Sequence, residues 1–380
     1  MLTPVGAHST RRAPRISCCS WRFAMKPKYS IFALLLTAAL SACNSSAQTG
    51  TTGTTVTPGP AVTTPADAQT TKVVAAANAF LSTLSATQKN AVSFAYTDSA
   101  QRAKWSNFPT GIFQRDGVKW GDLSAAQRTA LTTLLGTVLS ADGVKMVQQQ
   151  MAADDILKSQ GGGNLQFGSD EYYVSFLGTP SATTAWTLQF GGHHLAINAT
   201  VAGGNITLAP SLTGGQPIYT TINGQTVAVV EDVPQEVKDA FALLSSLDAA
   251  QQAKAVISTK SIDLVLGPGQ DGKTLQAEGL PGSAMTAAQK TAFLTLIKER
   301  LNALNDDDLA PKMADIEKNL DSTSFAWYGP TSAAGDAYYR VTGPTVLIEF
   351  SPQSMGGNSA NHIHSMYRDP TDDYGSALVK

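Results

Sequence analysis

The stretch Leu123-Ser-Ala-Ala-Gln-Arg-Thr-Ala-Leu131 has a near copy 162 positions later, Met285-Thr-Ala-Ala-Gln-Lys-Thr-Ala-Phe293. In both, a hydroxyl side chain stands three residues before a glutamine. This pattern is typical of a helix start in which the two side chains each satisfy a backbone N–H of the first turn. A second pair, Ser85-Ala-Thr-Gln88 and Asp248-Ala-Ala-Gln251, is separated by 163 positions. Four such signatures at a matched offset predict an internal duplication.

Each of the two units, about 72–215 and 234–380, places helices before strands. Helical spacing of apolar residues predicts helices over 124–139 and 143–158 in the first unit and over 286–304 and 308–320 in the second. Shorter runs rich in aromatic and β-branched residues then predict strands over 172–177, 185–190, 195–201, 325–328, 337–341 and 346–350. The sequence therefore predicts an α+β fold in which two helices-then-antiparallel-strands units form one pseudo-twofold domain over 72–380.

The N-terminal region carries a second pattern. Lys26 and Lys28 precede a short apolar run over 31–40, which ends in Leu40-Ser-Ala-Cys43. A permanent membrane helix needs about 20 apolar residues, so this run predicts a cleaved secretory signal over 25–42. Leu-Ser-Ala-Cys also resembles a bacterial lipobox, and this resemblance implies that Cys43 carries lipid as the first mature residue. The alternative is an uncleaved anchor.

The surroundings of this signal lead to three further expectations. Residues 1–24 match no targeting signal, and we interpret them as a start codon assigned too early or an extension. By the usual lipoprotein sorting pattern, Asn44 after the lipidated cysteine favours the outer membrane of the cell envelope. Residues 43–71 are rich in Thr, Pro and Gly, and this composition predicts a flexible spacer between the membrane and the domain.

The charge and cysteine content narrow the classes of function. Residues 1–42 hold six basic residues and no acidic one, so 21 basic and 29 acidic residues remain, with a net charge of −8. A chain this acidic lacks the basic surface that nucleic acid requires, and anionic lipid repels it unless a covalent tether holds it. The three cysteines all lie at or before Cys43, so a metal site in the folded part must use histidine, carboxylate or backbone oxygen.

Four histidines follow the signal, and they fall into two pairs, His193 with His194 and His362 with His364. Residues two apart on a strand point to one face, so His362 and His364 can present their imidazoles to one point. His193 and His194 would face opposite ways on a regular strand, so we expect only one of them to join. Three imidazoles with an open fourth position suit zinc or copper, and Glu349 is the candidate carboxylate. The alternative is that the imidazoles are structural and lock the sheet to neighbouring loops.

Two arginines lie among aromatic and acidic residues near these histidines, Arg340 after two tyrosines and Arg368 before Asp369. They are candidates for binding an anionic substrate. A structural ion-pair network is the favoured interpretation, because Arg368 has acidic neighbours to hand.

Several motifs in order resemble one protein family: 190–195 (Phe-Gly-Gly-His-His-Leu), 325–330 (Phe-Ala-Trp-Tyr-Gly-Pro), 338–340 (Tyr-Tyr-Arg), 362–370 (His-Ile-His-Ser-Met-Tyr-Arg-Asp-Pro) and 373–375 (Asp-Tyr-Gly). The chain resembles the uncharacterised secreted family "domain of unknown function 3500" over about 72–380. The resemblance implies no activity and supplies no catalytic residues.

Two hypotheses about function remain. In the first, the chain is a metal-dependent hydrolase or oxidoreductase of the cell envelope, in which the histidines hold the ion and Glu349 or Asp369 serves as base. In the second, it is a non-catalytic lipoprotein that binds metal or ligand, or whose histidine pairs are structural. The partners expected are the membrane, through Cys43, and an unidentified small-molecule or polymer ligand.

Overall fold

The computed structural model describes residues 56–161, 163–332, 335–355 and 357–379. Its helices are α1 Ala68–Ser82, α2 Ala86–Val92, α3 Ser99–Arg102, α4 Ala125–Val138, α5 Ala141–Ser159, α6 Asp232–Ser246, α7 Ala249–Ala255, α8 Ala287–Leu301 and α9 Asp306–Lys318. Its strands are β1 Ser93–Phe94, β2 Val118–Lys119, β3 Tyr173–Leu177, β4 Trp186–Gly192, β5 Leu195–Ala202, β6 Asn205–Thr207, β7 Ser211–Gly215, β8 Tyr219–Ile222, β9 Gln225–Ala228, β10 Val256–Ser258, β11 Leu280–Pro281, β12 Ser324–Tyr328, β13 Tyr338–Thr342, β14 Leu347–Pro352 and β15 Ile363–Arg368.

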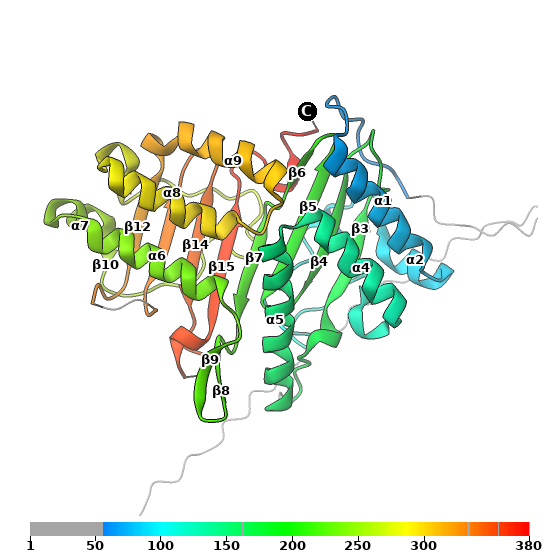
Figure 1. Ribbon diagram of the computed structural model, residues 1–380, viewed down its shortest axis with the longest axis horizontal. Helices are drawn as coiled ribbons and strands as arrows, with labels where there is room; N and C mark the ends of the chain where they lie inside the picture. Colours follow the sequence, from blue (N-terminus) through cyan, green and yellow to red (C-terminus); the bar gives the residue numbers. More distant parts are fainter. Residues whose placement is uncertain (1–55, 162, 333–334, 356, 380) are drawn as a thin grey trace, which may run out of the picture. The chain divides into compact units, whose positions relative to one another are not determined.

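One large sheet organises the described part of the chain, in the order β1-β3-β4-β5-β7-β15-β14-β13-β12-β10. Most neighbours are antiparallel, whereas the outer pairs β1–β3 and β10–β12 are parallel. The pairing of β7 with β15 joins the strands of the first half to those of the second. Figure 1 shows the long helices α1, α4, α5, α6, α8 and α9 in front of this sheet. The fold is therefore α+β with a mostly antiparallel sheet, as the sequence predicts.

The four glutamine signatures all begin helices in the manner predicted. Reciprocal capping boxes start α2, α4, α7 and α8. The same glutamines also bond across helices, since Gln127 Nε2 donates to Gln88 Oε1 at 3.0 Å and Gln289 Nε2 donates to Gln251 Oε1 at 2.9 Å. The signatures thus satisfy the first turns of their helices and tie α2 to α4 in the first half and α7 to α8 in the second.

The main core lies between the helices and one face of the sheet, where Trp186 and Trp327 are fully buried. The opposite face is covered by two long connections, the first loop (95–117, between β1 and β2) and the second loop (259–279, between β10 and β11). Trp105 of the first loop packs on that face together with Leu264 of the second loop. Central strands are therefore buried on both faces, so their sequences are apolar or polar-but-bonded at nearly every position.

The ends of the predicted helices and strands agree with the observed ones to within three residues. The described part of the spacer predicted over 43–71 includes residues that belong to the folded structure. Thr57 accepts a backbone hydrogen bond from Tyr96, Ala61 bridges Thr184, and α1 already begins at Ala68. Gly59 allows this segment to lie close to Ala185, because a Cβ at position 59 would stand 1.9 Å from the Ala185 carbonyl oxygen.

The residues to which the predictions for 1–24, for the signal over 25–42 and for Cys43 refer lie outside the described part of the chain. Among the described residues, no helix combines the length and the apolar character needed to cross a membrane.

Candidate metal centre

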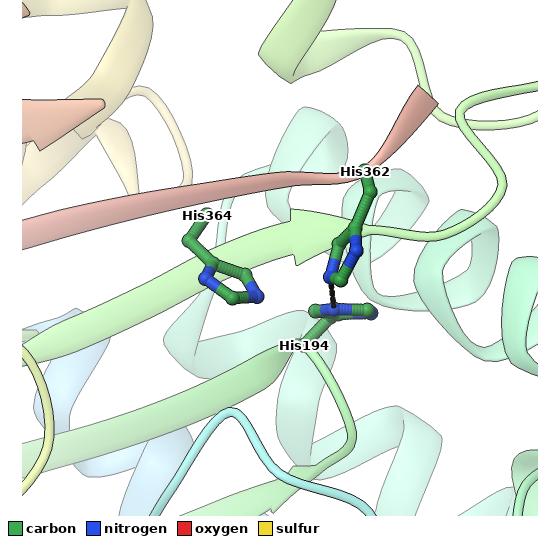
Figure 2. Close-up of side chains that lie close together, drawn as sticks. All are labelled: His194, His362 and His364. Atoms are coloured by element: carbon green, nitrogen blue, oxygen red, sulfur yellow. Dashed lines mark hydrogen bonds between the residues drawn. The ribbon is translucent and has the colours of Figure 1, made fainter. Parts of the chain in front are cut away.

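Three of the four predicted histidines meet at one point on the loop-covered face of the sheet. His364 lies in β15, His362 directly precedes that strand, and His194 lies in the two-residue turn between β4 and β5. One ligand nitrogen from each lies within 4.8 Å of the others, and all three side chains are buried. Figure 2 shows the rings of His362 and His364 pointing from the strand toward His194. We call these three residues the histidine cluster.

Glycines shape both sides of the histidine cluster. Gly191 lies so close to the returning strand that a Cβ would stand 2.3 Å from the Leu195 carbonyl oxygen, and this approach permits the short β4–β5 turn. In that turn, His194 adopts a left-handed conformation with φ of 62°. On the neighbouring strand, Gly214 stands opposite His364 and has no side chain that could fill the space beside the imidazole.

The distances within the histidine cluster are compatible with a metal site. Nε2 of His194 lies 3.0 Å from Nε2 of His362, as the dashed line in Figure 2 shows. Ligand nitrogens of a tetrahedral zinc site with Zn–N bonds of about 2.0–2.1 Å are about 3.3–3.4 Å apart. The ring centroid of His364 lies 5.1 Å from that of His194 and 5.0 Å from that of His362. One nitrogen of each ring lies within 4.8 Å of the other two, which is compatible with a site for one ion.

Burial keeps these imidazoles neutral. It lowers the pKa of His194 and His364 well below the ordinary value, and the other imidazoles of the group add to the effect. Burial also lowers the pKa of His362, although the hydrogen bond to the Met355 carbonyl acts in the opposite direction and raises it. Because Nδ1 of His362 lies 2.8 Å from that carbonyl oxygen, it must carry the proton and donate it. Nε2 of His362 is then left with a lone pair, the state that a metal ligand requires.

His193 does not join the histidine cluster, although its ring lies next to it. Its Nδ1 lies 2.7 Å from a carboxylate oxygen of Asp154 in α5, and its carbonyl accepts a hydrogen bond from Tyr172. The ring centroids of His193 and His194 are 3.7 Å apart. The two rings therefore lie against each other, tilted by 32°, instead of facing opposite ways, because they occupy a turn and not a regular strand. The expectation that one member of this pair meets His362 and His364 agrees with the structure, and that member is His194.

Glu349 lies on the same face of the sheet but in a different hydrogen-bonded group. Its carboxylate accepts from the backbone N–H of Val265 at 2.8 Å and of Leu266 at 2.7 Å, and from the Tyr338 hydroxyl at 2.6 Å. We call Glu349 with these three partners the Glu349 network. The alternation along β14 places Glu349 away from the apolar core, as predicted. The structure does not bring its carboxylate into the histidine cluster.

The other candidate residues bind parts of the chain itself. Arg340 pairs with Glu278, and Arg368 pairs with Asp271 at 3.0 Å and Asp373 at 2.7 Å. Arg368 also donates to the Leu266 carbonyl at 2.8 Å, so it fastens the second loop to β15.

Asp369 pairs with Lys312 of α9 and accepts from the backbone and the hydroxyl of Thr371 at 2.9 and 2.8 Å. These contacts agree with the structural interpretation favoured for the arginines, and they leave Asp369 outside the histidine cluster.

Sequence reasoning missed two neighbours of the histidine cluster and the partner of His193. Nδ2 of Asn107 lies 3.4 Å from Nε2 of His364, and the Asn107 carbonyl accepts from the backbone N–H of His194 at 3.3 Å. Met355 supplies its carbonyl to His362, and Asp154 of α5 pairs with His193. Backbone acceptors and loop residues such as these carry no spacing pattern, so the sequence offered no signal for them.

A pocket of about 410 Å³ opens beside His362. It is lined by the end of α5, the β8–β9 hairpin and the segment before β15, with Gln160, Thr221 and Asn361 among the lining residues. The histidine cluster therefore has a neighbouring space large enough for a small ligand.

The fold and the site together define an α+β protein with three buried histidines on the loop-covered face of its sheet. A family model described as "Protein of unknown function (DUF3500)" matches residues 66–376, and the chain belongs to this family. This confirms the resemblance seen in the sequence. No curated protein matches the chain, and no solved structure does.

Proposed function

We propose that this protein binds one divalent transition-metal ion, zinc or copper, through His194, His362 and His364. The observation that carries the proposal is that three buried imidazoles, from positions up to 170 residues apart in the chain, bring their ligand nitrogens within 4.8 Å of one another. Neutral imidazoles suit both ions, and three of them leave a fourth position for water or a ligand.

The hydrogen bonding favours this role over a purely structural one. A structural histidine in a protein core bonds through its ring nitrogens to other protein groups. In the described part of the chain, Nε2 of His194 bonds only to a nitrogen of His362, another member of the cluster, and Nε2 of His364 has only a long contact of 3.4 Å to the amide of Asn107. His193 shows the contrast, because its Nδ1 is paired with the carboxylate of Asp154. The nitrogens of the histidine cluster therefore bond mainly to one another and have no carboxylate partner.

A second candidate function is catalysis at this ion, as a hydrolase or an oxidoreductase. The pocket beside His362 supports it, because a ligand held there would lie next to the fourth position. A bound ion would supply Lewis acidity and acidify a bound water. The three histidines would hold it, and the bond from His362 to the Met355 carbonyl would keep one ring oriented. Glu349 and Asp369, proposed from the sequence as bases, have their oxygens engaged elsewhere.

Metal analysis of protein purified without a histidine tag tests the proposal. We expect about one equivalent of zinc or copper in the wild type and almost none in the double variant His362→Ala with His364→Ala. Thr213→Val is the matched control, because Thr213 lies on the adjacent strand β7 and its buried hydroxyl bonds to no other described residue. Absence of stoichiometric metal in the wild type, or equal metal in the double variant, contradicts the proposal.

We also propose that the mature chain is a lipoprotein of the bacterial cell envelope, anchored through lipid on Cys43 and sorted to the outer membrane. The lipobox pattern and the short apolar run before it support this proposal. Labelling of growing cells with a tagged fatty acid, followed by fractionation, tests it. Wild-type protein should carry the label and Cys43→Ser should not, and label in both would contradict the assignment.

The two halves of the sheet support our further proposal of an internal duplication around a pseudo-twofold axis. Matched glutamine pairs, matched capping boxes and one parallel outer strand pair occur in each half. Superposition of α4 with β3–β5 on α8 with β12–β14 in an experimental structure tests it. A common chain path for these elements is expected, and unrelated paths would refute the duplication.

A further inference from the structure

The pocket beside His362 has walls from three separate parts of the chain. Leu157 and Gln160 come from the end of α5, Thr220 and Thr221 come from β8, and Asn361 directly precedes His362. Figure 1 shows the β8–β9 hairpin near the end of α5 and the start of β15. This hairpin forms a two-stranded sheet of its own and does not extend the main sheet.

The lining of this pocket holds no aspartate, glutamate, lysine or arginine. Apart from His362, its polar members offer only amides and hydroxyls. Gln160 and Thr221 are exposed and Gln216 and Thr220 half-buried, and none of these side chains bonds to another group in the described part of the chain. The pocket therefore offers several donors and acceptors that a ligand can reach around a volume of about 410 Å³.

This lining discriminates between classes of ligand. A charged ligand would lose hydration there without meeting an opposite charge, which is costly. An apolar ligand would cover the amides and hydroxyls without bonding to them, and groups left unpaired in this way also cost free energy. A neutral ligand rich in hydroxyl groups avoids both penalties. The ring of Tyr219 and the side chain of Pro217 add flat apolar surface against which a sugar ring can pack.

We infer that the pocket binds a neutral saccharide, with one ligand hydroxyl directed toward the ion at the histidine cluster. The inference deepens the proposed metal site and rests on it for that last contact, since oxygen is a suitable fourth ligand for zinc. Recognition within the pocket rests on the amide and hydroxyl side chains alone.

Isothermal titration of the zinc-loaded full-length chain tests the inference. The neutral probes are cellobiose, maltotriose and N,N′-diacetylchitobiose, and the charged controls are glucuronic acid and glucosamine 6-phosphate. We expect at least one neutral probe to bind about tenfold or more tightly than either charged control. Gln160→Ala with Thr221→Ala should weaken that binding by about fivefold to tenfold. Gln225→Ala, on the same hairpin but outside the lining, should leave the affinity unchanged.

Three results would overturn the inference: no binding of any neutral probe, equal binding of the charged controls, or equal weakening by Gln225→Ala. Metal analysis of the same samples separates this failure from failure of the metal proposal. Zinc present at one equivalent without saccharide binding refutes the saccharide and leaves the metal site intact. Saccharide binding that depends on Gln160 and Thr221 in protein without stoichiometric metal supports the pocket assignment and refutes the metal site.

Discussion

Two buried polar groups lie next to each other on the loop-covered face of the sheet, and they differ in what they leave unused. His364 stands opposite Ser351 in the β14–β15 register, two residues along β14 from Glu349. In the Glu349 network, one carboxylate accepts three hydrogen bonds from the chain's own groups. In the histidine cluster, imidazole nitrogens face mainly one another. A candidate site is therefore better recognised by unused bonding capacity than by the presence of charged residues.

Metal addition gives the largest expected effect and separates the two groups directly. An ion that binds only the folded chain stabilises it by about 4 kcal/mol at a free concentration of about 1,000 times its Kd. We expect zinc to raise the melting temperature of metal-free wild type and to leave that of His194→Ala unchanged. Thermal unfolding with and without a chelator measures this. A zinc-dependent rise of equal size in His194→Ala would contradict the role given to the histidine cluster.

Glu349→Gln gives the next largest effect, on stability and not on metal content. The new amide would keep one acceptor oxygen and turn an NH₂ group toward one of the backbone donors. We expect the free energy of unfolding to fall by about 2–4 kcal/mol, with metal stoichiometry unchanged. Urea unfolding measures the first quantity and metal analysis the second. Tyr338→Phe removes only one of the three donors and should cost about 1 kcal/mol. Loss of metal in Glu349→Gln would show that the two groups are not independent.

Glu236 is a third buried polar group, on the helix-covered face of the sheet. The pH dependence of the free energy of unfolding tests its role. Burial raises the pKa of Glu236 to about 8, above the ordinary value of 4.5, although Arg300 opposes the shift. The folded chain thus favours the protonated form. The stability that protonated Glu236 contributes is fully present below about pH 4.5 and is lost as the pH rises to about 8. Glu236→Gln should flatten this decline in the free energy of unfolding.

Urea unfolding of Glu236→Gln and wild type at several pH values between about 5 and 8 measures the difference. Asp232, whose pKa burial raises to about 6, contributes a decline of the same sign at the lower end of this range. Asp232 contributes equally to both proteins, and so do the buried histidines, whose lowered pKa gives a slope of opposite sign, so the difference between wild type and variant reports Glu236. An unchanged slope between pH 6 and 8 would mean that Glu236 does not titrate as its burial implies.

The sequence predicted the regular elements well because their signals are local. Capping boxes and periodic apolar residues placed α4 and α8 closely. The strand β7 was not predicted, since Gly214 and Gly215 lower the strand propensity of its five residues. Yet this strand joins the two halves and leaves room for His364. The place of β7 in the sheet depends on its pairing with β15. Because β15 lies far along the chain, this pairing leaves no local signal in the sequence.

The candidate site was predictable only where its signal is local. The two-residue spacing of His362 and His364 predicted that their side chains share a face. Which member of the other pair joins them depended on the turn conformation of His194 and on the attachment of His193 to Asp154. Glu349 was expected near the ion because it lies on the correct face. The second loop instead presents two backbone N–H groups to it, and no sequence pattern indicated that contact.

Tyr374→Phe gives the smallest expected effect. It concerns the first and second loops, which cover both the histidine cluster and the Glu349 network. The Tyr374 hydroxyl accepts from Trp105 of the first loop at 2.8 Å and donates to Asp271 of the second loop at 2.9 Å, so it links the two loops. Its removal should cost about 1 kcal/mol, because the mostly buried Trp105 nitrogen loses its acceptor. We expect faster hydrogen exchange in residues 103–107 and 264–271, with metal content unchanged. Unchanged exchange would show that packing of Trp105 against the sheet, and not this hydroxyl, holds the loops over the histidine cluster and the Glu349 network.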